Sequence, residues 1–215
     1  MTPTPDLRLT LNNIGKAYGT RRVLSGVNQI VLGGECLAVV GANGSGKSTL
    51  LKIVAGLLRP TRGEISIVIN GMNIGDANDR RRVIGYCAPD LSLYPELSGM
   101  ENLRFFAEVR GESVQSGEIE KRLDGVGLTG RGGDSVASYS SGMKQRLRLA
   151  FAFRGGDVPV LLLDEPSLAL DSGGVALVEA MIRDHKARGA ITLLATNDAR
   201  EVAWADHQIS VEIGK

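Results

Sequence analysis

The sequence predicts an α/β fold: a core sheet, an antiparallel β subdomain and an inserted helical subdomain. Three stretches indicate this. A short Val-rich apolar run at 37–40 leads through a glycine-rich loop into a helical pattern, which is typical of a buried strand followed by a helix. Near the N-terminus, residues 7–14 alternate between apolar and polar, as antiparallel strands do. From 98 to 128, apolar residues instead recur at helical spacing.

Length and composition limit the classes of protein to consider. The 215 residues suit one domain, 1–215, with the helical subdomain inserted at about 98–150. A net charge of +1 gives no sign of a general nucleic-acid or anionic-membrane surface, so no nucleic-acid partner is expected. Cys36 and Cys87 are far apart and predict buried thiols, as in a reducing cytosol. The start of the chain lacks a signal-peptide pattern, and no apolar run approaches the ~18 residues that span a bilayer.

The first half of the chain predicts mainly strands. Residues 7–14 are expected to form an edge strand, and 23–31 the strand after it. An alternating segment at 64–70 ends in Asn70-Gly71, a hairpin signal. The basic run 80–82 is interpreted as a solvated face, and 83–87 as a short strand.

The second half alternates helices and apolar strands. The expected helices cover 98–128 with glycine interruptions, 142–153, 177–188 and 199–205. The expected strands cover 160–163, 191–196 and 208–213, and 130–138 is expected to be a loop. His185, on the amphipathic helix, and His207, near the tail, are both expected at the surface.

The glycine-rich loop carries the strongest chemical signal in the chain. Residues 41–48 fit G-x-x-x-x-G-K-[ST] and lie between a predicted strand and a predicted helix, the context in which this motif binds phosphates. Lys47 is expected to reach the β- and γ-phosphates, and the Ser48 hydroxyl to bind Mg²⁺. The nucleotide-binding residues predicted here are Gly41, Ala42, Asn43, Gly44, Ser45, Gly46, Lys47, Ser48 and Thr49.

A second signal is the pair of acids that ends the apolar strand 160–163. In a parallel sheet the carboxyl ends of neighbouring strands share a crevice, so Asp164 can lie beside the phosphate-binding loop and hold Mg²⁺. Two adjacent acids at a buried strand end repel each other. A metal for Asp164 and a general-base role for Glu165 remove that conflict.

A third motif gives the chain a family resemblance. Residues 139–146, YSSGMKQR, resemble the LSGGQ-x-QR signature of ATP-binding cassette (ABC) ATPases and lie shortly before the 160–163 strand, as in that family. The matching positions are Ser140, Gly142, Gln145 and Arg146, whereas Tyr139, Ser141 and Met143 are substitutions found in some exporter-like members.

The resemblance covers nearly the whole chain and implies a way of working. It implies that Tyr18 stacks on adenine and that 167–171 form the loop that carries an aspartate across a dimer interface. Two copies would bind head to tail, each ATP lying between the phosphate-binding loop of one and Ser140 and Gly142 of the other. ATP and Mg²⁺ are the expected cofactors. The expected function is the ATP-hydrolysing subunit of a transporter, cytoplasmic and peripheral on the inner face of the membrane through a separate transmembrane permease.

Two positions depart from the family pattern. Asp90 replaces the usual glutamine after the 83–87 strand, and Asn197 replaces the usual histidine after the last core strand. The resemblance places Asp90 at Mg²⁺ and Asn197 at the reacting phosphate, which makes both candidates for catalysis. We expect the chain to keep its ability to bind ATP. The substitutions at Asp90 and Asn197 are expected to affect the rate of ATP hydrolysis instead.

Two other functions stay open at the level of sequence. One is a soluble ABC ATPase acting on nucleic acid or ribosomes, although this chain shows one cassette and a near-neutral charge. The other is a nucleotide-gated module with very slow hydrolysis, suggested by Asn197 and opposed by Glu165.

Overall fold

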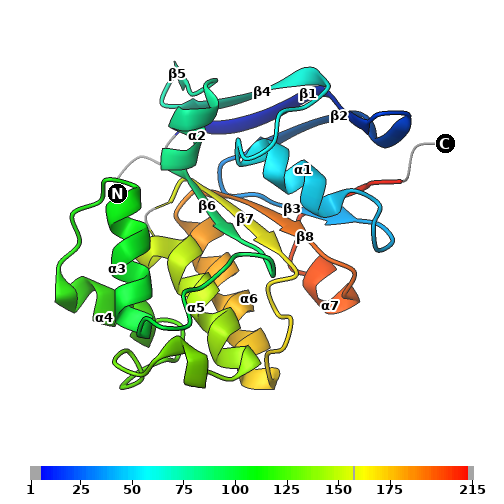
Figure 1. The fold of residues 1–215 in the computed structure, drawn as a ribbon. Coiled ribbons are helices and arrows are strands. Elements are labelled where there is room, and N and C mark those ends of the chain that lie inside the picture. Colours follow the sequence, from blue (N-terminus) through cyan, green and yellow to red (C-terminus); the bar gives the residue numbers. More distant parts are fainter. Residues whose placement is uncertain (1–5, 157, 213–215) are drawn as a thin grey trace.

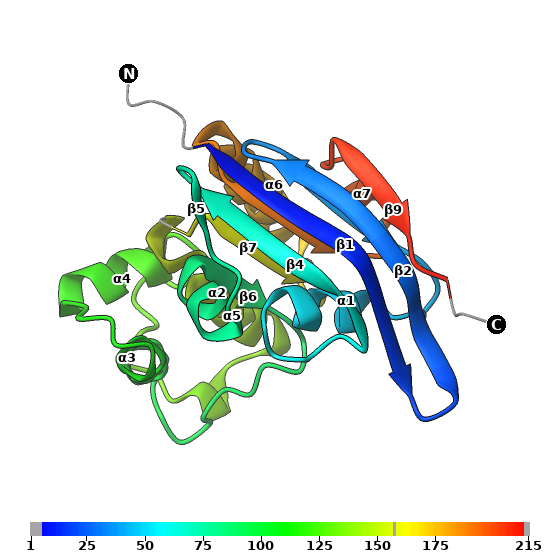
Figure 2. The same ribbon diagram turned by 90° about the horizontal axis from the view of Figure 1, so that it is seen from above.

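A computed structural model describes residues 6–156 and 158–212, arranged around two sheets (Figures 1 and 2). The antiparallel sheet has the order β2-β1-β4-β5 and the parallel sheet the order β6-β7-β8-β3-β9. Their strands are β1 (Leu7–Tyr18), β2 (Arg21–Leu32), β3 (Cys36–Val40), β4 (Arg62–Ile69), β5 (Met72–Asn73), β6 (Ile84–Cys87), β7 (Val160–Asp164), β8 (Ile191–Ala195) and β9 (His207–Ser210). The predicted α/β fold class is confirmed.

The antiparallel sheet differs from the prediction in the place of its first strand. β1 pairs with β2 on one side and β4 on the other, so it is an inner strand and the expected edge position was wrong. Alternation reports that one face of a strand is buried, as Leu7, Leu9 and Leu11 are, and does not distinguish inner strands from edge strands. The hairpin at Asn70-Gly71 forms as predicted, since β5 pairs with β4 across it.

The parallel sheet supplies the buried centre of the molecule. All five residues of β7 and all five of β8 are buried, as expected for strands covered on both faces. Helix α1 (Lys47–Val54) lies between this sheet and the antiparallel sheet, and its Leu50, Leu51 and Ile53 join the core that both sheets share (Figure 1). Helices α6 (Ser172–Ala187) and α7 (Ala199–Val202) follow β7 and β8 in the chain.

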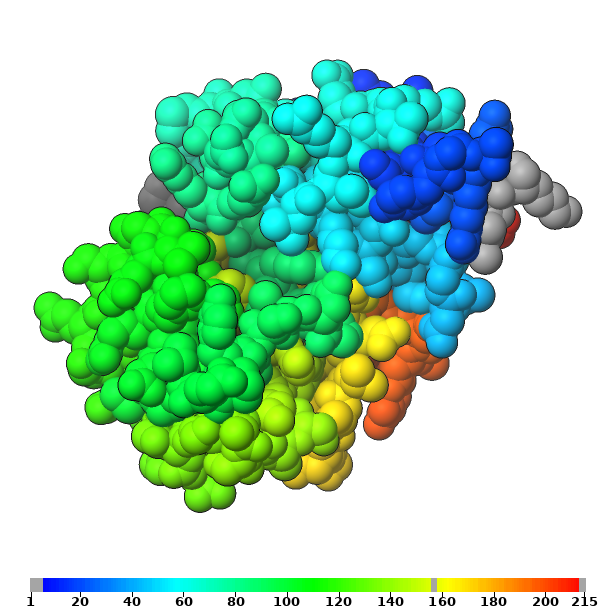
Figure 3. Space-filling model, viewed as in Figure 1, coloured from blue at the N-terminus to red at the C-terminus, as the bar shows by residue number. Residues whose placement is uncertain are grey.

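The helical subdomain follows β6 and precedes β7 in the chain. It contains α3 (Gly99–Val109), α4 (Ser116–Asp124) and α5 (Ser141–Phe153), with short 3₁₀ turns at Val136–Ser138 and Arg154–Gly156. Residues of α3 and α4 lie together at the side of the space-filling view, coloured green in Figure 3, whereas α5 packs against β6 and β7 of the parallel sheet. Helix α3 begins with a capping box, in which Ser98 and Glu101 bond each other's backbone N–H groups. Gly111, with φ 74°, follows α3 and separates it from α4.

Two helices depart from the sequence expectation. Helix α2 (Ala77–Val83) contains the basic run that was expected to be solvated, and within it Arg80 is buried and donates from Nη1 to the Gly75 carbonyl at 2.8 Å. This helix was missed because its polar composition has no apolar period; its signal is the Asp76 cap. Helix α6 begins five residues before the expected start at 177, because Asp171 caps it. The prediction missed this first turn because Gly173 and Gly174 interrupt the apolar residues at helical spacing.

The two histidines of the sequence have opposite environments. His207 is exposed, as expected, but His185 is fully buried, so the surface prediction was wrong. The imidazole Nδ1 lies 3.0 Å from the Thr192 hydroxyl and Nε2 lies 2.7 Å from the Val158 carbonyl oxygen. Burial lowers the pKa of His185 from 6.5 to about 4. Both cysteines are free and buried, as predicted.

Candidate nucleotide site

The loop between β3 and α1 has the backbone form that its glycines predict. Gly46, the N-cap of α1, has φ 113°, and a Cβ placed there would lie 2.9 Å from Cγ1 of Val23. At Gly41, with φ 151°, a Cβ would lie 2.3 Å from the Val211 carbonyl oxygen. Both positions therefore require glycine, which leaves the loop backbone free to approach a phosphate chain.

A pocket of about 520 Å³ opens over this loop, a volume within the usual range for small-molecule sites. It brings Tyr18 and Glu165 together with the phosphate-binding loop, although these residues are far apart in sequence. The pocket-lining residues are Tyr18, Arg21, Val23, Asn43, Gly44, Gly46, Lys47, Ser48, Thr49 and Glu165. Sequence reasoning missed Arg21 and Val23, whose only signal is their place directly after the Tyr18 turn.

The loop is suited to a phosphate chain. Lys47 is buried, and its ammonium group donates to the carbonyl oxygens of Gly41 at 2.8 Å and Ala42 at 3.3 Å. Within residues 6–156 and 158–212, the hydroxyl of Ser45 is buried without a hydrogen-bond partner. A cation, an unpaired hydroxyl and the N-terminal end of α1 thus lie on one short loop, which is the donor set that an anion requires.

Asp164 and Ser48 form the part of the site that fits Mg²⁺. The Asp164 carboxylate is buried and accepts a hydrogen bond from the Ser48 side chain. Burial is the main cause of a raised pKa at Asp164, and the nearby charges of Glu165 and Asp90 act in the same direction. A desolvated carboxylate beside a hydroxyl offers the hard oxygen ligands that Mg²⁺ prefers. A cation bound there would also offset the repulsion between the Asp164 carboxylate and the charges of Glu165 and Asp90.

Glu165 reaches the pocket through an uncommon backbone conformation. Its φ is 48°, in the left-handed region, and its N–H donates to the Ala195 carbonyl at 2.9 Å. A non-glycine residue in this region costs about 1–2 kcal/mol. The turn redirects the chain after β7, so that Asp164 stays at the strand end while Glu165 lines the pocket. The residue pattern alone gave no signal of this conformation.

The two positions that depart from the family pattern both lie close to the loop. The Asn197 side chain, just beyond β8, donates from Nδ2 to Oδ1 of Asn43 in the phosphate-binding loop. Asp90 pairs with Lys52 of α1, with 2.5 Å between Oδ2 and Nζ. Its charge also acts on Asp164, as noted above, so Asp90 is near the predicted metal site, while its own ion-pair partner is Lys52.

Ser140 and Gly142 occupy a different surface, at the start of α5. Ser140 is exposed and caps α5, its Oγ accepting from the Met143 N–H at 3.2 Å. A Cβ at Gly142 would lie 3.0 Å from the Ala169 carbonyl oxygen, which places this glycine against the 167–171 loop. Neither residue is among those that line the 520 Å³ pocket of the described chain.

Side-chain hydrogen bonds connect the elements around the site. In α5, Gln145 donates to the Pro166 carbonyl at 2.9 Å, and Arg146 lies 3.2 Å from Asp171. Glu201 of α7 is buried and accepts from both the N–H and the hydroxyl of Ser167. Sequence reasoning did not single out Glu201, because an acid on a short helix is usually a surface residue.

A strand, a glycine loop and a helix, with Lys47 and Ser48 lining one pocket and Asp164 hydrogen-bonded to Ser48, define a P-loop nucleotide-binding protein. The comparisons with known proteins narrow this class. The sequence profile described as ABC transporter matches residues 24–168, about two thirds of the chain. The chain therefore belongs to the ABC transporter family, as an ATP-binding ATPase cassette.

Individual relatives agree with this assignment. The chain is 33% identical over 214 residues to the uncharacterized ABC transporter ATP-binding protein YdbJ of Bacillus subtilis, covering 96% of this chain and 67% of that protein. It is 37% identical over 186 residues to the cytochrome c biogenesis ATP-binding export protein CcmA of Methylococcus capsulatus, covering 86% and 88%.

Solved structures show the same fold. An ATP-binding subunit of an ABC transporter is 32% identical, with a TM-score of 0.80 and coverage of 95% of this chain and 85% of that one. A dimeric ATP-binding cassette bound to ADP and Pi, 24% identical, gives a TM-score of 0.84 with coverage of 96% and 97%. In the ranges 6–156 and 158–212, no helix has the length and apolar character needed to cross a bilayer.

Proposed function

We propose that two copies of this chain close head to tail on two Mg·ATP and thereby drive a separate transmembrane permease. The separation of two phosphate-binding surfaces on one chain carries this proposal. Lys47 and Glu165 line one pocket, whereas Ser140 and the N-terminal end of α5 lie elsewhere and are exposed. A helix N-terminus capped by serine favours an anion, and a second copy supplies one most simply.

Within each half-site, the residues divide the work by position. Tyr18, exposed at the rim, stacks on the adenine, and Lys47 with the backbone N–H groups of the loop binds the phosphates. Ser48 and Asp164 would hold Mg²⁺, which would supply positive charge to offset that of the phosphates. Glu165 accepts the proton of the attacking water, and Asn197, fixed against Asn43, donates to the γ-phosphate.

We further propose where the permease binds. A pocket of about 230 Å³ between α1 and the helical subdomain is apolar at its centre, with Tyr86, Leu91, Phe106 and Phe151 among its lining residues. Leu57 and Val109 at this pocket are 54% and 70% exposed. Exposed apolar side chains grouped beside an apolar pocket are typical of protein–protein interaction surfaces. Three arginines, Arg81, Arg110 and Arg154, also line it. Arg110 and Arg154 already form ion pairs with Glu112, so it is the apolar lining that fits the apolar face of an amphipathic permease helix.

This arrangement accounts for the location proposed for the chain. Bound through a permease helix, the chain lies on the cytoplasmic face of the membrane. Replacing Val109 with Glu should abolish co-purification with the permease and leave ATP affinity unchanged, because Val109 lines the apolar pocket and not the nucleotide pocket. Retained co-purification would place the permease on another surface.

The experiment that tests the core of the proposal uses Glu165→Gln. This variant should keep ATP binding, lose about 10²–10⁴-fold in steady-state phosphate release, and elute as a dimer in Mg·ATP by size exclusion. The matched control is Glu120→Gln on the exposed face of α4, which should behave like the parent. A Glu165→Gln protein that stays monomeric and turns over at the parent rate would refute both the general base and the head-to-tail interface.

A further inference from the structure

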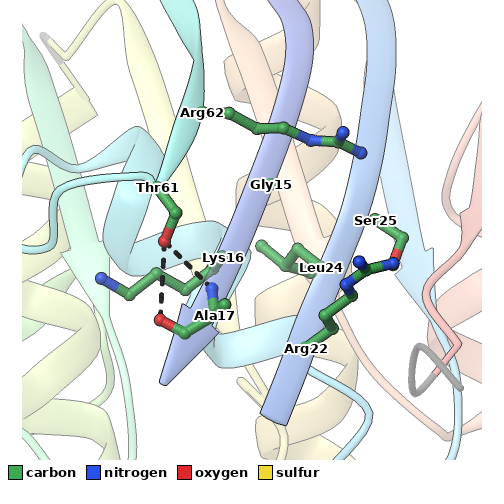
Figure 4. Close-up of a pocket in the computed structure, with 8 residues that line it drawn as sticks. All are labelled: Gly15, Lys16, Ala17, Arg22, Leu24, Ser25, Thr61 and Arg62. Carbon is green, nitrogen blue, oxygen red and sulfur yellow. Dashed lines mark hydrogen bonds between the residues drawn. The ribbon is translucent and has the colours of Figure 1, made fainter. Parts of the chain in front are cut away.

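A second pocket, of about 270 Å³, lies on the antiparallel sheet and has no part in the nucleotide site (Figure 4). β1, β2 and β4 all contribute to it, through Gly15, Arg22, Ser25 and Arg62 among others. Successive residues of a strand point to opposite sides, and β2 uses this alternation. Arg21 lines the nucleotide pocket, whereas Arg22 lines the second pocket.

The strand register builds the pocket. Gly15 of β1 stands opposite Ser25 of β2 on one side and opposite Arg62 of β4 on the other, so these three residues form one row across the sheet. Figure 4 shows the Arg62 side chain extending from β4 over Gly15 towards β2, while the Arg22 guanidinium lies near Ser25. The register thus brings two guanidinium groups and a hydroxyl from separate segments to one hollow.

Glycine makes this placement of Arg62 sterically allowed. A Cβ at Gly15 would lie 2.7 Å from both Cγ and Nε of Arg62, and a Cβ at Gly26 would lie 3.0 Å from its Nη2. The arginine therefore lies in a trough formed by two glycines on neighbouring strands. A side chain restricted in this way loses less conformational entropy when a ligand binds.

The charge of the pocket is not balanced by the protein. Its lining residues include no carboxylate, and within the described ranges neither the Arg22 nor the Arg62 guanidinium forms an ion pair or a side-chain hydrogen bond. Lys16, a third cation at the pocket, points away from the arginines in Figure 4 and donates to the Arg59 carbonyl at 2.8 Å. Both arginines are exposed at the pocket, and a bound anion would supply the counter-charge that the lining residues lack.

We propose that this pocket binds a phosphoryl group. Planar guanidinium groups bind the oxygens of phosphate in pairs, and two of them match the charge of a phosphoryl dianion better than that of a monocarboxylate. The volume of about 270 Å³ suits a phosphate or pyrophosphate group rather than a whole nucleotide. Such a group comes either from a free phosphate compound or from a phospholipid head group, and the shared chemistry is the same.

Binding of a soluble probe tests the site directly. Inorganic pyrophosphate is titrated calorimetrically into the full chain with saturating ADP, which keeps the nucleotide pocket filled. Arg22→Gln and Arg62→Gln should each weaken binding by about tenfold or more, the usual effect of removing one charge-assisted contact. Arg8→Gln is the matched control, because Arg8 is an exposed arginine on β1 that does not line the pocket and should bind like the parent.

A charge-neutral variant separates a formed site from general attraction to a basic surface. Gly15→Ala leaves the charge unchanged and displaces Arg62, so it should weaken pyrophosphate binding by several-fold, whereas general attraction would be unaffected. In a second arm, the same proteins are sedimented with phosphatidylcholine vesicles with and without phosphatidic acid. Arginine-dependent binding to phosphatidic acid alone identifies a lipid head group, and binding to pyrophosphate alone identifies a soluble compound. No binding in either arm, or equal binding by the parent, Gly15→Ala and both arginine variants, would overturn the proposal.

Discussion

The buried His185 makes the stability of the protein depend on pH in a calculable way. Its ring contacts the Thr192 hydroxyl and the Val158 carbonyl, and this geometry fits a neutral imidazole that accepts at Nδ1 and donates at Nε2. Burial holds its pKa at about 4 in the folded chain, below the ordinary value of 6.5. The contribution of neutral His185 to the free energy of unfolding is therefore fully present above about pH 6.5. It is lost as the pH falls from about 6.5 towards about 4.

The size of the effect follows from these two pKa values. At about 1.36 kcal/mol per pKa unit, protonation of His185 on unfolding lowers the free energy of unfolding by about 2 kcal/mol between about pH 7.5 and about pH 5. Asp164 acts in the opposite direction, because its raised pKa favours the folded state as the pH falls. A difference between two variants of the same chain removes that contribution.

The measurement is urea unfolding, followed by circular dichroism at about pH 7.5 and about pH 5, for the parent and His185→Gln. The parent should lose about 2 kcal/mol more than the variant over this interval. His207→Gln is the matched control, since the His207 side chain is 54% exposed, and it should keep the pH dependence of the parent. Equal losses in the parent and in His185→Gln would show that His185 is not buried as a neutral ring.

Four further predictions follow from the site and the fold. Lys47→Ala should abolish tight Mg·ATP binding in a titration, because it removes the buried cation of the phosphate-binding loop; unchanged affinity would remove Lys47 from the site. Asn197→Ala should lower steady-state phosphate release while Asn197→His keeps or raises it, and an alanine variant at the parent rate would mean that this side chain does not contact the reacting phosphate. The Asp90–Lys52 pair is partly exposed, at 63% and 34%, so a double-mutant cycle with Asp90→Asn and Lys52→Met should give a coupling below about 1 kcal/mol; a larger value would show a buried pair. Ser98→Ala should cost about 1 kcal/mol in urea unfolding through loss of the α3 cap, and no loss would mean that the cap is not formed in solution.

The sequence predicts the phosphate-binding loop well because everything that defines the loop is local. Gly41 and Gly46 are required by contacts with Val211 and Val23, yet the glycine pattern itself already signals a tight backbone turn between strand and helix. The order of the elements also followed from hydrophobic periodicity and composition. Every strand of both sheets was predicted as a separate strand, except β5, which has two residues. Local pattern is sufficient where a residue's role is fixed by its neighbours in the chain.

The features that could not be predicted depend on segments brought together by folding. His185 has the sequence context of a surface residue on an amphipathic helix, and it is buried because β8 and the segment before β7 supply its hydrogen-bond partners. Likewise, Glu201 is buried because Ser167 lies against α7. Whether such a polar group is buried depends on the hydrogen-bond partners that other segments bring to it. The hydrophobic pattern of its own segment therefore cannot identify it.

The Asp90 substitution shows how a departure from the family pattern is accommodated. A carboxylate near Asp164 adds negative charge to a site that already contains Glu165, and its effect is to raise the pKa of Asp164. Lys52, one turn beyond the phosphate-binding loop, places a cation 2.5 Å from that added charge. The segment after β6 is also held from the other side, where Arg148 of α5 donates to the Leu91 carbonyl at 3.0 Å. Asp90 therefore joins the segment to α1 by an ion pair, with its charge offset locally, which is why we expect ATP binding to survive the substitution.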